Sequence, residues 1–266
     1  MYRAFYSLSA VPFRKEIDNK NFYRSEALEE GMARLEYLKN TRGIGVVAGE
    51  PGAGKTSLLR KFAASLNPSL FKAVYFPLST VTVTEFYRGL TLGLGEEPKF
   101  RKVDMYAQIQ QAVLNLFHNQ KITPVLILDE MQMASNQFLN DISLLFNFSM
   151  DSQNPFVLIL VGLPHFMERL KLSHNQPLAQ RVLMRYSMKP LGKEAVKEYL
   201  QHQLKLAGAN HDIFTPQAME AIASRSRGFP RLINNMATNC LLYGCAKKLE
   251  IINDEAVFAV ASDTGI

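Results

Sequence analysis

The sequence predicts an α/β protein with a parallel, doubly wound sheet, followed by an all-helical C-terminal part. Between about residues 41 and 190, short apolar runs alternate with amphipathic segments, and beyond residue 191 the strand signal disappears. Such alternation of strands and helices favours a parallel sheet that is covered by helices. We therefore expect three regions: an N-terminal segment with its own helix (1–40), an α/β core (41–190) and a helical lid (191–266).

Each expected strand is nearly continuous in apolar residues, as is typical of strands whose two faces are both covered by helices. The five strands are 44–48, 73–76, 125–128, 156–161 and 186–188. The helical spacing of apolar residues predicts helices at 25–39, 56–66, 83–93, 104–118, 136–148 and 164–171. Ser25 is the expected N-cap of the first of these helices.

The helical lid is expected to contain four helices, at 193–207, 216–225, 231–247 and 254–260. Thr215 followed by Pro216 is typical of a helix start, because proline fits the first helical position. The two cysteines, Cys240 and Cys245, lie five apart on the third of these helices and therefore on different faces. We expect two buried free thiols, as is typical of a cytoplasmic protein.

The composition is that of a globular protein with a positive charge. The chain has 266 residues, of which 47% are hydrophobic, and a net charge of +6. Its longest apolar run, 156–163, is far shorter than the roughly 20 residues that cross a bilayer. We expect no membrane segment and no signal peptide, and we expect contact with nucleic acid or another anionic partner.

Residues 49–56, G-E-P-G-A-G-K-T, match the phosphate-binding pattern G-x-x-x-x-G-K-[ST] in full. An apolar strand precedes this loop and a helix follows it, which is the context that the pattern requires. Glycines allow backbone N–H groups to turn inward around phosphate oxygens, and the helix N-terminus adds roughly half a positive charge. The candidate nucleotide-binding residues are Gly49, Glu50, Pro51, Gly52, Ala53, Gly54, Lys55, Thr56 and Ser57.

The polar chemistry of the site is expected from four side chains. The ammonium group of Lys55 would reach the terminal phosphates of ATP, and the hydroxyl of Thr56 would bind Mg²⁺. The third strand ends in Asp129 and Glu130. Because Mg²⁺ prefers oxygen ligands, Asp129 is the second candidate metal ligand. Glu130 is placed to polarise the water that attacks the γ-phosphate.

Arginines are candidates for binding the charge of the transferred phosphoryl group. Arg181 lies just before the last core strand, and an arginine presented from there can act on the nucleotide of a neighbouring subunit. Arg185 is its nearest rival for this role. Arg231 opens a helix of the lid and is expected to bind and sense the nucleotide. The alternative for each is an ordinary solvated arginine.

With these motifs in order, the chain resembles the AAA+ ATPases, and within them the ExeA-type branch and the transposon helper ATPases TnsC, TniB and Mu B. The resemblance implies a RecA-like core with a C-terminal helical lid, ATP and Mg²⁺ as cofactors, and nucleotide bound between subunits in a hexameric ring or helical filament. It extends over most of the chain and is carried by Phe5-Tyr6, Pro12-Phe13, residues 49–56, Asp129-Glu130, Gly162-x-Pro164, Gln180-Arg181 and Gly228-x-Pro230-Arg231-x-Ile233-Asn234.

The end of the fourth strand departs from this resemblance. Such ATPases usually place a polar residue there to orient the attacking water, whereas here Val161-Gly162 leads into Leu163. We therefore expect ATP hydrolysis that is slow or stimulated by a partner. Such behaviour suits a switch better than a motor.

The resemblance and the basic charge together favour a regulator of transposition. In this hypothesis the protein assembles on duplex DNA with ATP, presents the target to a transposase, and is released after hydrolysis. We expect contacts to the DNA backbone and not to base edges. The candidate contacts lie between the second and third strands: Ser79, Thr80, Thr82, Lys99, Arg101 and Lys102.

Two other functions stay open. The first is a cytoplasmic ATPase of an ExeA-type secretion system, although the transmembrane helix and periplasmic part expected of such proteins are not seen in this sequence. The second is a nucleotide-gated adaptor that binds protein partners but not DNA. For the basic residues 99–102, the alternative is a solvated loop.

Overall fold

The computed structural model describes residues 2–14, 18–77, 82–148, 150 and 152–264. The chain forms two compact units. The sheet unit comprises Glu30–Pro51 and Lys55–Met188, and the helical unit comprises Met1–Glu29, Gly52–Gly54 and Lys189–Ile266. Within the described residues, no helix has both the length and the hydropathy that crossing a membrane requires.

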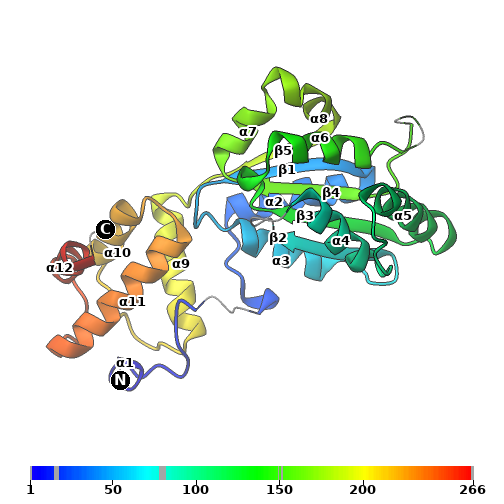
Figure 1. Cartoon of the computed structure of the whole chain (residues 1–266). Helices are drawn as coiled ribbons and strands as arrows, with labels where there is room; N and C mark the ends of the chain where they lie inside the picture. The colour runs from blue at the N-terminus through cyan, green and yellow to red at the C-terminus, as the bar shows by residue number, and fades with distance from the viewer. Residues whose placement is uncertain (1, 15–17, 78–81, 149, 151, 265–266) are drawn as a thin grey trace. The chain divides into compact units, whose positions relative to one another are not determined.

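Five parallel strands form the sheet, in the spatial order β2-β3-β4-β1-β5 (Figure 1). Their bounds are β1 (Gly43–Gly49), β2 (Phe71–Pro77), β3 (Thr123–Asp129), β4 (Val157–Gly162) and β5 (Val182–Met188). The predicted α/β class with a parallel sheet is confirmed. β5 is longer than predicted, because Arg185 interrupts its apolar residues and the side chains along this edge strand alternate between buried and exposed.

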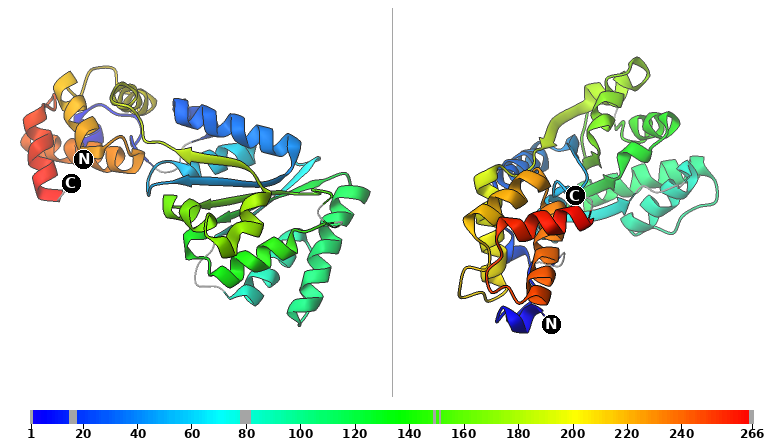
Figure 2. Two further views of the ribbon diagram at one scale, coloured as in Figure 1. Left: turned by 90° about the horizontal axis from the view of Figure 1, so that it is seen from above. Right: turned by 90° about the vertical axis from the view of Figure 1, so that its left-hand side faces the viewer.

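Helices cover both faces of the sheet. Two of them share one face, where a Cβ at Gly31 would touch Leu58: α2 (Glu26–Thr41) and α3 (Lys55–Ser65). The other face, which includes Val46 and Leu160, is packed under a second group of helices. These are α4 (Val83–Leu94), α5 (Lys102–Leu114), α6 (Asn136–Leu145), α7 (Pro164–Leu170) and α8 (Gln176–Arg181). In Figure 2, α2 (blue) lies on one side of the strands and the green helices lie on the other.

Several short helical turns are not indicated by the sequence, because three to six residues show no clear periodicity. Besides α8, these are α1 (Tyr2–Phe5), the 3₁₀ turns η1 (Asn19–Asn21), η3 (Met131–Met133) and η5 (Ser173–Asn175), and the π-helical turn η2 (Asn115–Asn119). The turn η3 follows β3 directly after Glu130, so the backbone bends sharply at the candidate active site.

The helical unit is built from four helices and the N-terminal segment. The helices are α9 (Lys193–Leu206), α10 (Pro216–Ser226), α11 (Pro230–Lys247) and α12 (Asp254–Thr264). Tyr6 is only 1% exposed in this core, and its hydroxyl donates a 2.9 Å hydrogen bond to the carbonyl oxygen of Leu249. The N-terminal segment therefore completes the core of the C-terminal helices.

Local details of the helical unit agree with the sequence in one case and differ in another. Oγ1 of Thr215 accepts a hydrogen bond from the backbone N–H of Ala218 at 3.1 Å, so Thr215 is the N-cap of α10 as predicted. Cys240 is buried, and burial raises the pKa of its thiol to about 12. Cys245 is only partly buried, so the expectation of two buried thiols is wrong for this residue.

Candidate nucleotide-binding site

The glycine-rich motif connects β1 to α3 in a strand–loop–helix arrangement. β1 ends at Gly49, and α3 begins at Lys55. Gly52 and Gly54 have φ angles of 80° and 106°, a region in which a side chain would be strained. Successive N–H groups in such a loop, together with the unpaired N–H groups at a helix N-terminus, form a concave anion-binding surface.

The side chain of Lys55 turns back over this loop. Its Nζ donates hydrogen bonds to the carbonyl oxygens of Gly49 at 2.7 Å and Glu50 at 3.2 Å. Thr56, the second residue of α3, is exposed. These groups suit the phosphates of a nucleoside triphosphate: two glycines with positive φ angles, the N-terminus of α3 and the ammonium group of Lys55. The Thr56 hydroxyl is suited to be a ligand of Mg²⁺. When bound, Mg²⁺-ATP would supply the phosphoryl group that reacts.

The remaining residues of the motif differ in exposure. Glu50 and Pro51 are exposed, and Ser57 is partly buried in the first turn of α3. Ala53 is buried, with only 3% of its surface exposed. Because proline has no N–H group, Pro51 cannot donate to a phosphate, and the donors must come from its neighbours.

Asp129 is the last residue of β3 and is 5% exposed. Its Oδ1 accepts the backbone N–H of Glu130 at 2.8 Å, and its Oδ2 accepts the hydroxyl of Tyr75 at 3.0 Å. Burial, followed by the charge of Asp129, raises the pKa of Tyr75 to about 12, so this phenol stays a donor at neutral pH. Tyr75 lies on the neighbouring strand β2, and no signal in the sequence indicated this role.

Glu130 has a left-handed backbone conformation with a φ of 61°, which is uncommon for a residue other than glycine. Its carboxylate oxygen Oε2 accepts a hydrogen bond from Nε2 of Gln132. Oε1 of Gln132 in turn accepts the backbone N–H of Leu163 at 3.1 Å. The end of β4 is thus linked to the candidate base through the backbone of Leu163 and the side chain of Gln132, a residue that the sequence did not single out.

The strand register brings the loop and the carboxylates to one edge of the sheet. Val46 of β1 and Leu128 of β3 both pair with Leu160 of β4. Asp129 follows Leu128 directly, and Gly49 ends β1 at the same side. Ligands of parallel α/β sheets bind at this carboxyl edge. The geometry therefore supports one site with phosphate-binding and metal-binding parts.

The two arginines near β5 have partners within the sheet unit. Arg181 ends α8, is partly buried, and donates from Nη1 to the carbonyl oxygen of Ser143 in α6. Arg185 is exposed and donates from Nη2 to the carbonyl oxygen of Ala179 at 2.6 Å. Action of either residue on the nucleotide of a neighbouring subunit stays a prediction.

Arg231 is the second residue of α11, and its side chain is exposed. Its backbone N–H lies 3.4 Å from the carbonyl oxygen of Gly52, within the helical unit. A Cβ at Gly52 would lie 2.8 Å from the Cβ of Arg231. Glycine is thus required at position 52 by this contact as well as by its φ angle. Sensing of the nucleotide by the Arg231 side chain stays a prediction.

The candidate DNA contacts that follow β2 are only partly described. Ser79 and Thr80 lie outside the described residues. Thr82 is the N-cap of α4, where its hydroxyl accepts the N–H of Glu85 and lies 2.8 Å from the Glu85 carboxylate. This capping box explains Thr82 without DNA.

The basic residues before and at the start of α5 differ from one another. Lys102 forms a 2.6 Å ion pair with Asp141, so its charge is balanced within the sheet unit. Lys99 and Arg101 are exposed. Phe100 between them is 89% exposed and contributes little to the core. An exposed aromatic side chain between two cations remains available to a partner.

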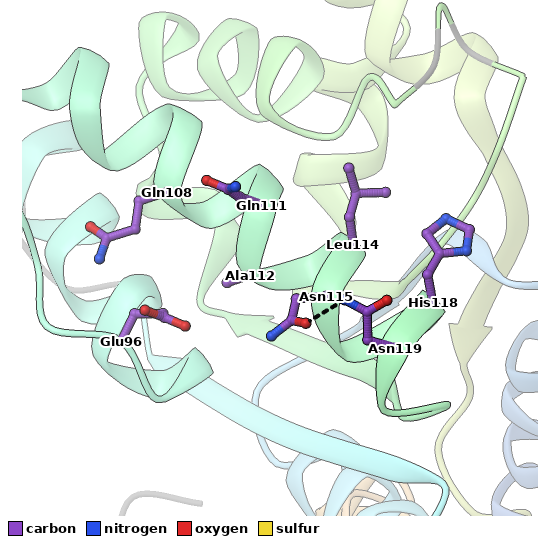
Figure 3. A pocket seen from close by; sticks show the side chains of 8 residues that line it. All are labelled: Glu96, Gln108, Gln111, Ala112, Leu114, Asn115, His118 and Asn119. Carbon is purple, nitrogen blue, oxygen red and sulfur yellow. Dashed lines mark hydrogen bonds between the residues drawn. The ribbon is translucent and has the colours of Figure 1, made fainter.

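A polar cavity of about 500 Å³ lies elsewhere in the sheet unit (Figure 3). It is lined by residues of α5 and η2 and by Glu96, and Nδ2 of Asn119 donates to Oδ1 of Asn115 at 2.8 Å beside it. Because η2 precedes β3, this cavity lies toward the amino end of that strand. Asp129 is at the opposite end, so the cavity is separate from the candidate nucleotide site.

The chain is similar to one curated protein and to solved structures. It is 29% identical over 278 aligned positions to General secretion pathway protein A from Aeromonas hydrophila, with 100% of this chain aligned. The chain spans about half (49%) of the length of that relative. Drosophila ORC bound to DNA has a TM-score of 0.71 at 15% identity, covering 100% of this chain and 66% of that one. CDC6P from Pyrobaculum aerophilum has a TM-score of 0.66 at 16% identity, covering 93% and 71%.

These structural likenesses establish the fold, a RecA-like core with a parallel sheet and a helical C-terminal region. One family model, described as AAA domain, matches residues 38–170, which is half of the chain. The matched segment contains the glycine-rich loop, Asp129 and Glu130. Membership of this family supports ATPase activity in general and the use of nucleotide and Mg²⁺. By its fold and by this match, the chain belongs to the AAA domain family.

Proposed function

We propose that this chain is a Mg²⁺-dependent ATPase that works as a nucleotide-controlled switch. The observation that carries the proposal is the common edge of the sheet from which the glycine-rich loop and the two carboxylates emerge. Lys55 and the loop N–H groups hold the phosphates, and Thr56 and Asp129 hold Mg²⁺. Glu130 takes the proton of the attacking water.

Hydrolysis without a partner is proposed to be slow. Leu163 directly follows β4 and has an apolar side chain, so it has no side-chain group that could orient water, and its backbone N–H already donates to Gln132. A slow rate lets the ATP-bound form persist long enough to recruit a partner before it is released.

The ATPase assignment is tested with Lys55→Ala, Glu130→Gln and the control Lys61→Ala, which removes another lysine of α3. Lys55→Ala should weaken Mg²⁺-ATP binding at least tenfold, because one charged phosphate contact is worth about 1.5–3 kcal/mol. Glu130→Gln should bind ATP normally and lose about 10²–10⁴-fold in turnover. Wild-type protein that fails to bind Mg²⁺-ATP, or a Glu130→Gln variant with wild-type turnover, would refute the assignment.

We further propose that the ATP-bound form assembles on duplex DNA and directs a transposase to its target. Support comes from the net charge of +6 and from Lys99 and Arg101, which flank the exposed Phe100. Two cations can bind backbone phosphates, and an aromatic ring between them can stack or pack against the nucleic acid. Such contacts position the protein without reading base sequence.

DNA binding is measured with random duplex DNA, with ATP and with ADP, at two salt concentrations. Tight, salt-sensitive binding with ATP alone is the expected result. The double variant Lys99→Ala/Arg101→Ala should lower the salt slope by roughly 0.9 for each phosphate that the protein no longer neutralises. The control Lys171→Ala/Lys205→Ala removes the same charge from two other exposed positions and should leave the slope unchanged. Absence of binding with either nucleotide would reject the DNA proposal.

A second candidate is the ATPase of an ExeA-type secretion system. It is favoured by the 29% identity to General secretion pathway protein A along this whole chain. In this case the ATP-bound form would bind a secretion component and would ignore DNA. A nucleotide-gated adaptor would likewise not bind DNA. The identity of the protein partner captured in the ATP state would distinguish the adaptor from the secretion ATPase.

We propose self-assembly into a ring or filament for each of these functions, with Arg181 acting on the nucleotide of the adjacent subunit, and a cytoplasmic location. Light scattering with a slowly hydrolysed ATP analogue should show oligomers. Arg181→Ala mixed with Glu130→Gln should restore some turnover, because each variant supplies what the other lacks. No restoration in a confirmed mixed oligomer would reject the role of Arg181 in trans.

A further inference from the structure

Gln132 joins the ends of two strands through a single side chain. From the turn η3, its Nε2 donates to Oε2 of Glu130, and its Oε1 accepts the backbone N–H of Leu163 at 3.1 Å. These two partners fix the orientation of the amide. If it were flipped, the amide oxygen would face a carboxylate and the NH₂ group would face an N–H, so neither hydrogen bond could form.

The backbone that carries Gln132 is itself held in place. Arg169 of α7 donates from Nη1 to the carbonyl oxygen of Gln132 at 3.1 Å and from Nη2 to that of Ala134 at 2.7 Å. A charged guanidinium group that binds two carbonyls of one turn restricts the turn strongly. Glu130 is therefore bound by a side chain whose own position is set by Leu163, directly after β4, and by Arg169 of α7.

We infer that Gln132 is a positioning residue for hydrolysis, which fixes the Glu130 carboxylate relative to the end of β4. The inference rests on the proposed function, because it takes Glu130 as the group that receives the proton from water. A glutamate has several rotamers, and a donor on one oxygen selects one of them. Oε1 of Glu130 then remains available to accept the proton of water.

The amide of Gln132 also provides a polar side chain at the position where Leu163 has an apolar one. Its Nε2 carries two N–H bonds, one of which points to Glu130. Among the described residues, no acceptor is found for the second. The same amide can therefore donate to a water molecule next to the carboxylate, and so orient both groups that take part in the proton transfer.

Two variants separate the two hydrogen bonds of Gln132. Gln132→Met removes both the donor to Glu130 and the acceptor for Leu163. Gln132→Glu keeps an acceptor for Leu163 but removes the donor and places a carboxylate against Glu130. If Gln132 positions Glu130, both variants should lose on the order of 10–100-fold in kcat, part of what a general base contributes, with KM for ATP within about threefold.

The hydrogen bond between the Leu163 N–H and Gln132 is measured independently of turnover. Amide hydrogen exchange of the Leu163 N–H is followed by NMR in nucleotide-free protein. Protection should persist in Gln132→Glu and disappear in Gln132→Met. If Gln132 were only structural, kcat would follow this protection and Gln132→Glu would resemble the wild type. An unprotected Leu163 N–H in the wild type would also overturn the inference.

The matched control is Gln110→Met. The Gln110 amide also joins elements through hydrogen bonds, to the carbonyl oxygens of Leu145 at 3.1 Å and Asn147 at 3.2 Å, but it does not contact Glu130. This variant should lower stability and leave kcat within about twofold. A loss of kcat equal to that of Gln132→Met would indicate a general effect of destabilisation and overturn the inference.

Glu130→Gln, measured in parallel, separates failure of the inference from failure of the proposed function. Wild-type turnover in Glu130→Gln would reject the proposed base and the inference with it. Loss of turnover in Glu130→Gln with normal kcat in both Gln132 variants would reject the inference alone. Single-turnover measurements with excess protein and labelled ATP give the rate constant even if steady-state turnover is very slow.

Discussion

The hydroxyl of Tyr75 donates a 3.0 Å hydrogen bond to Oδ2 of Asp129, although the two residues are 54 positions apart in the chain. β2 and β3 are adjacent and parallel, and their register places Pro77 opposite Asp129. Tyr75 lies two residues before Pro77, so its side chain is on the same face of the sheet as that of Asp129. The phenol and the N–H of Glu130 together fix both oxygens of the proposed metal ligand.

Tyr75→Phe should raise the Mg²⁺ concentration needed for ATP binding about three- to tenfold, the equivalent of one hydrogen bond. Fluorescence of a labelled ATP, titrated with Mg²⁺, measures the effect. Since the pKa of Tyr75 is raised to about 12, the phenol is protonated between pH 6 and 9, and the loss of affinity should be the same across this range. The stability that the neutral phenol contributes is lost only as the pH rises above 10, the ordinary pKa of tyrosine, towards the raised pKa of about 12.

The control for this prediction is Tyr37→Phe, which changes a tyrosine that is 57% exposed on α2. Its Mg²⁺ requirement should equal that of the wild type. A Tyr75→Phe protein with an unchanged Mg²⁺ requirement would show that the hydroxyl does not orient Asp129.

Gly162→Ala should lower kcat about threefold to thirtyfold while nucleotide affinity stays unchanged. An added Cβ would lie 3.2 Å from Oε1 of Gln132 and 3.3 Å from the Cβ of Phe166, so the glutamine must move by a few tenths of an ångström. Small displacements of a catalytic group have large effects on rate. The measurement is kcat beside the ATP dissociation constant, and a normal kcat would show that Gln132 tolerates the shift.

Gly52→Ala should weaken ATP binding at least tenfold. Alanine is strained at a φ of 80° by about 1–2 kcal/mol, and its Cβ would also meet Arg231. Isothermal titration with Mg²⁺-ATP measures the affinity, and circular dichroism confirms that the fold is retained. Gly192→Ala is the control, because a Cβ there has no neighbour within 4 Å among the described residues. Equal affinities in the two variants would contradict the prediction.

Gly228→Ala should destabilise the helical unit by about 2–4 kcal/mol. Gly228 has a φ of 76°, and a Cβ there would lie 2.0 Å from the carbonyl oxygen of Leu191. Leu191 also donates its backbone N–H to the carbonyl oxygen of Gly228, so its backbone cannot move away freely. Calorimetry should show a lower unfolding temperature for Gly228→Ala but not for Gly192→Ala. Identical temperatures would indicate that the backbone relaxes.

The parts of the fold that the sequence predicts are those with a local physical signal. The central strands are continuous apolar runs, and β1, β3 and β4 lie within about two residues of their predicted bounds. Ser25 accepts the N–H of Leu28 at 3.2 Å, as expected of an N-cap. The strand–loop–helix setting of the glycine-rich motif is likewise encoded in adjacent residues.

The parts that the sequence does not predict depend on partners far along the chain. Gln132 is an ordinary glutamine until folding brings it to Leu163, 31 positions away. Tyr75 resembles any aromatic residue of a strand until the sheet aligns it with Asp129. Neither has a spacing or a composition that identifies it. The register of β2, β3 and β4 creates both contacts. Register depends on how separate strands pair, so it cannot be predicted from any one segment of the sequence.

The packing of Tyr6 against Leu249 has a consequence for the time course of synthesis. These residues are 243 positions apart, which a ribosome takes roughly 12–50 s to translate. The sheet unit, whose residues end at Met188, can close during that interval. Tyr6, Leu8 and Phe13 belong to the core of the helical unit. They have to remain outside the folded sheet unit until the last helices of the chain have been synthesised. A nascent chain that stalls before Leu249 would therefore carry a finished sheet and an exposed apolar arm, which is the kind of segment that chaperones bind.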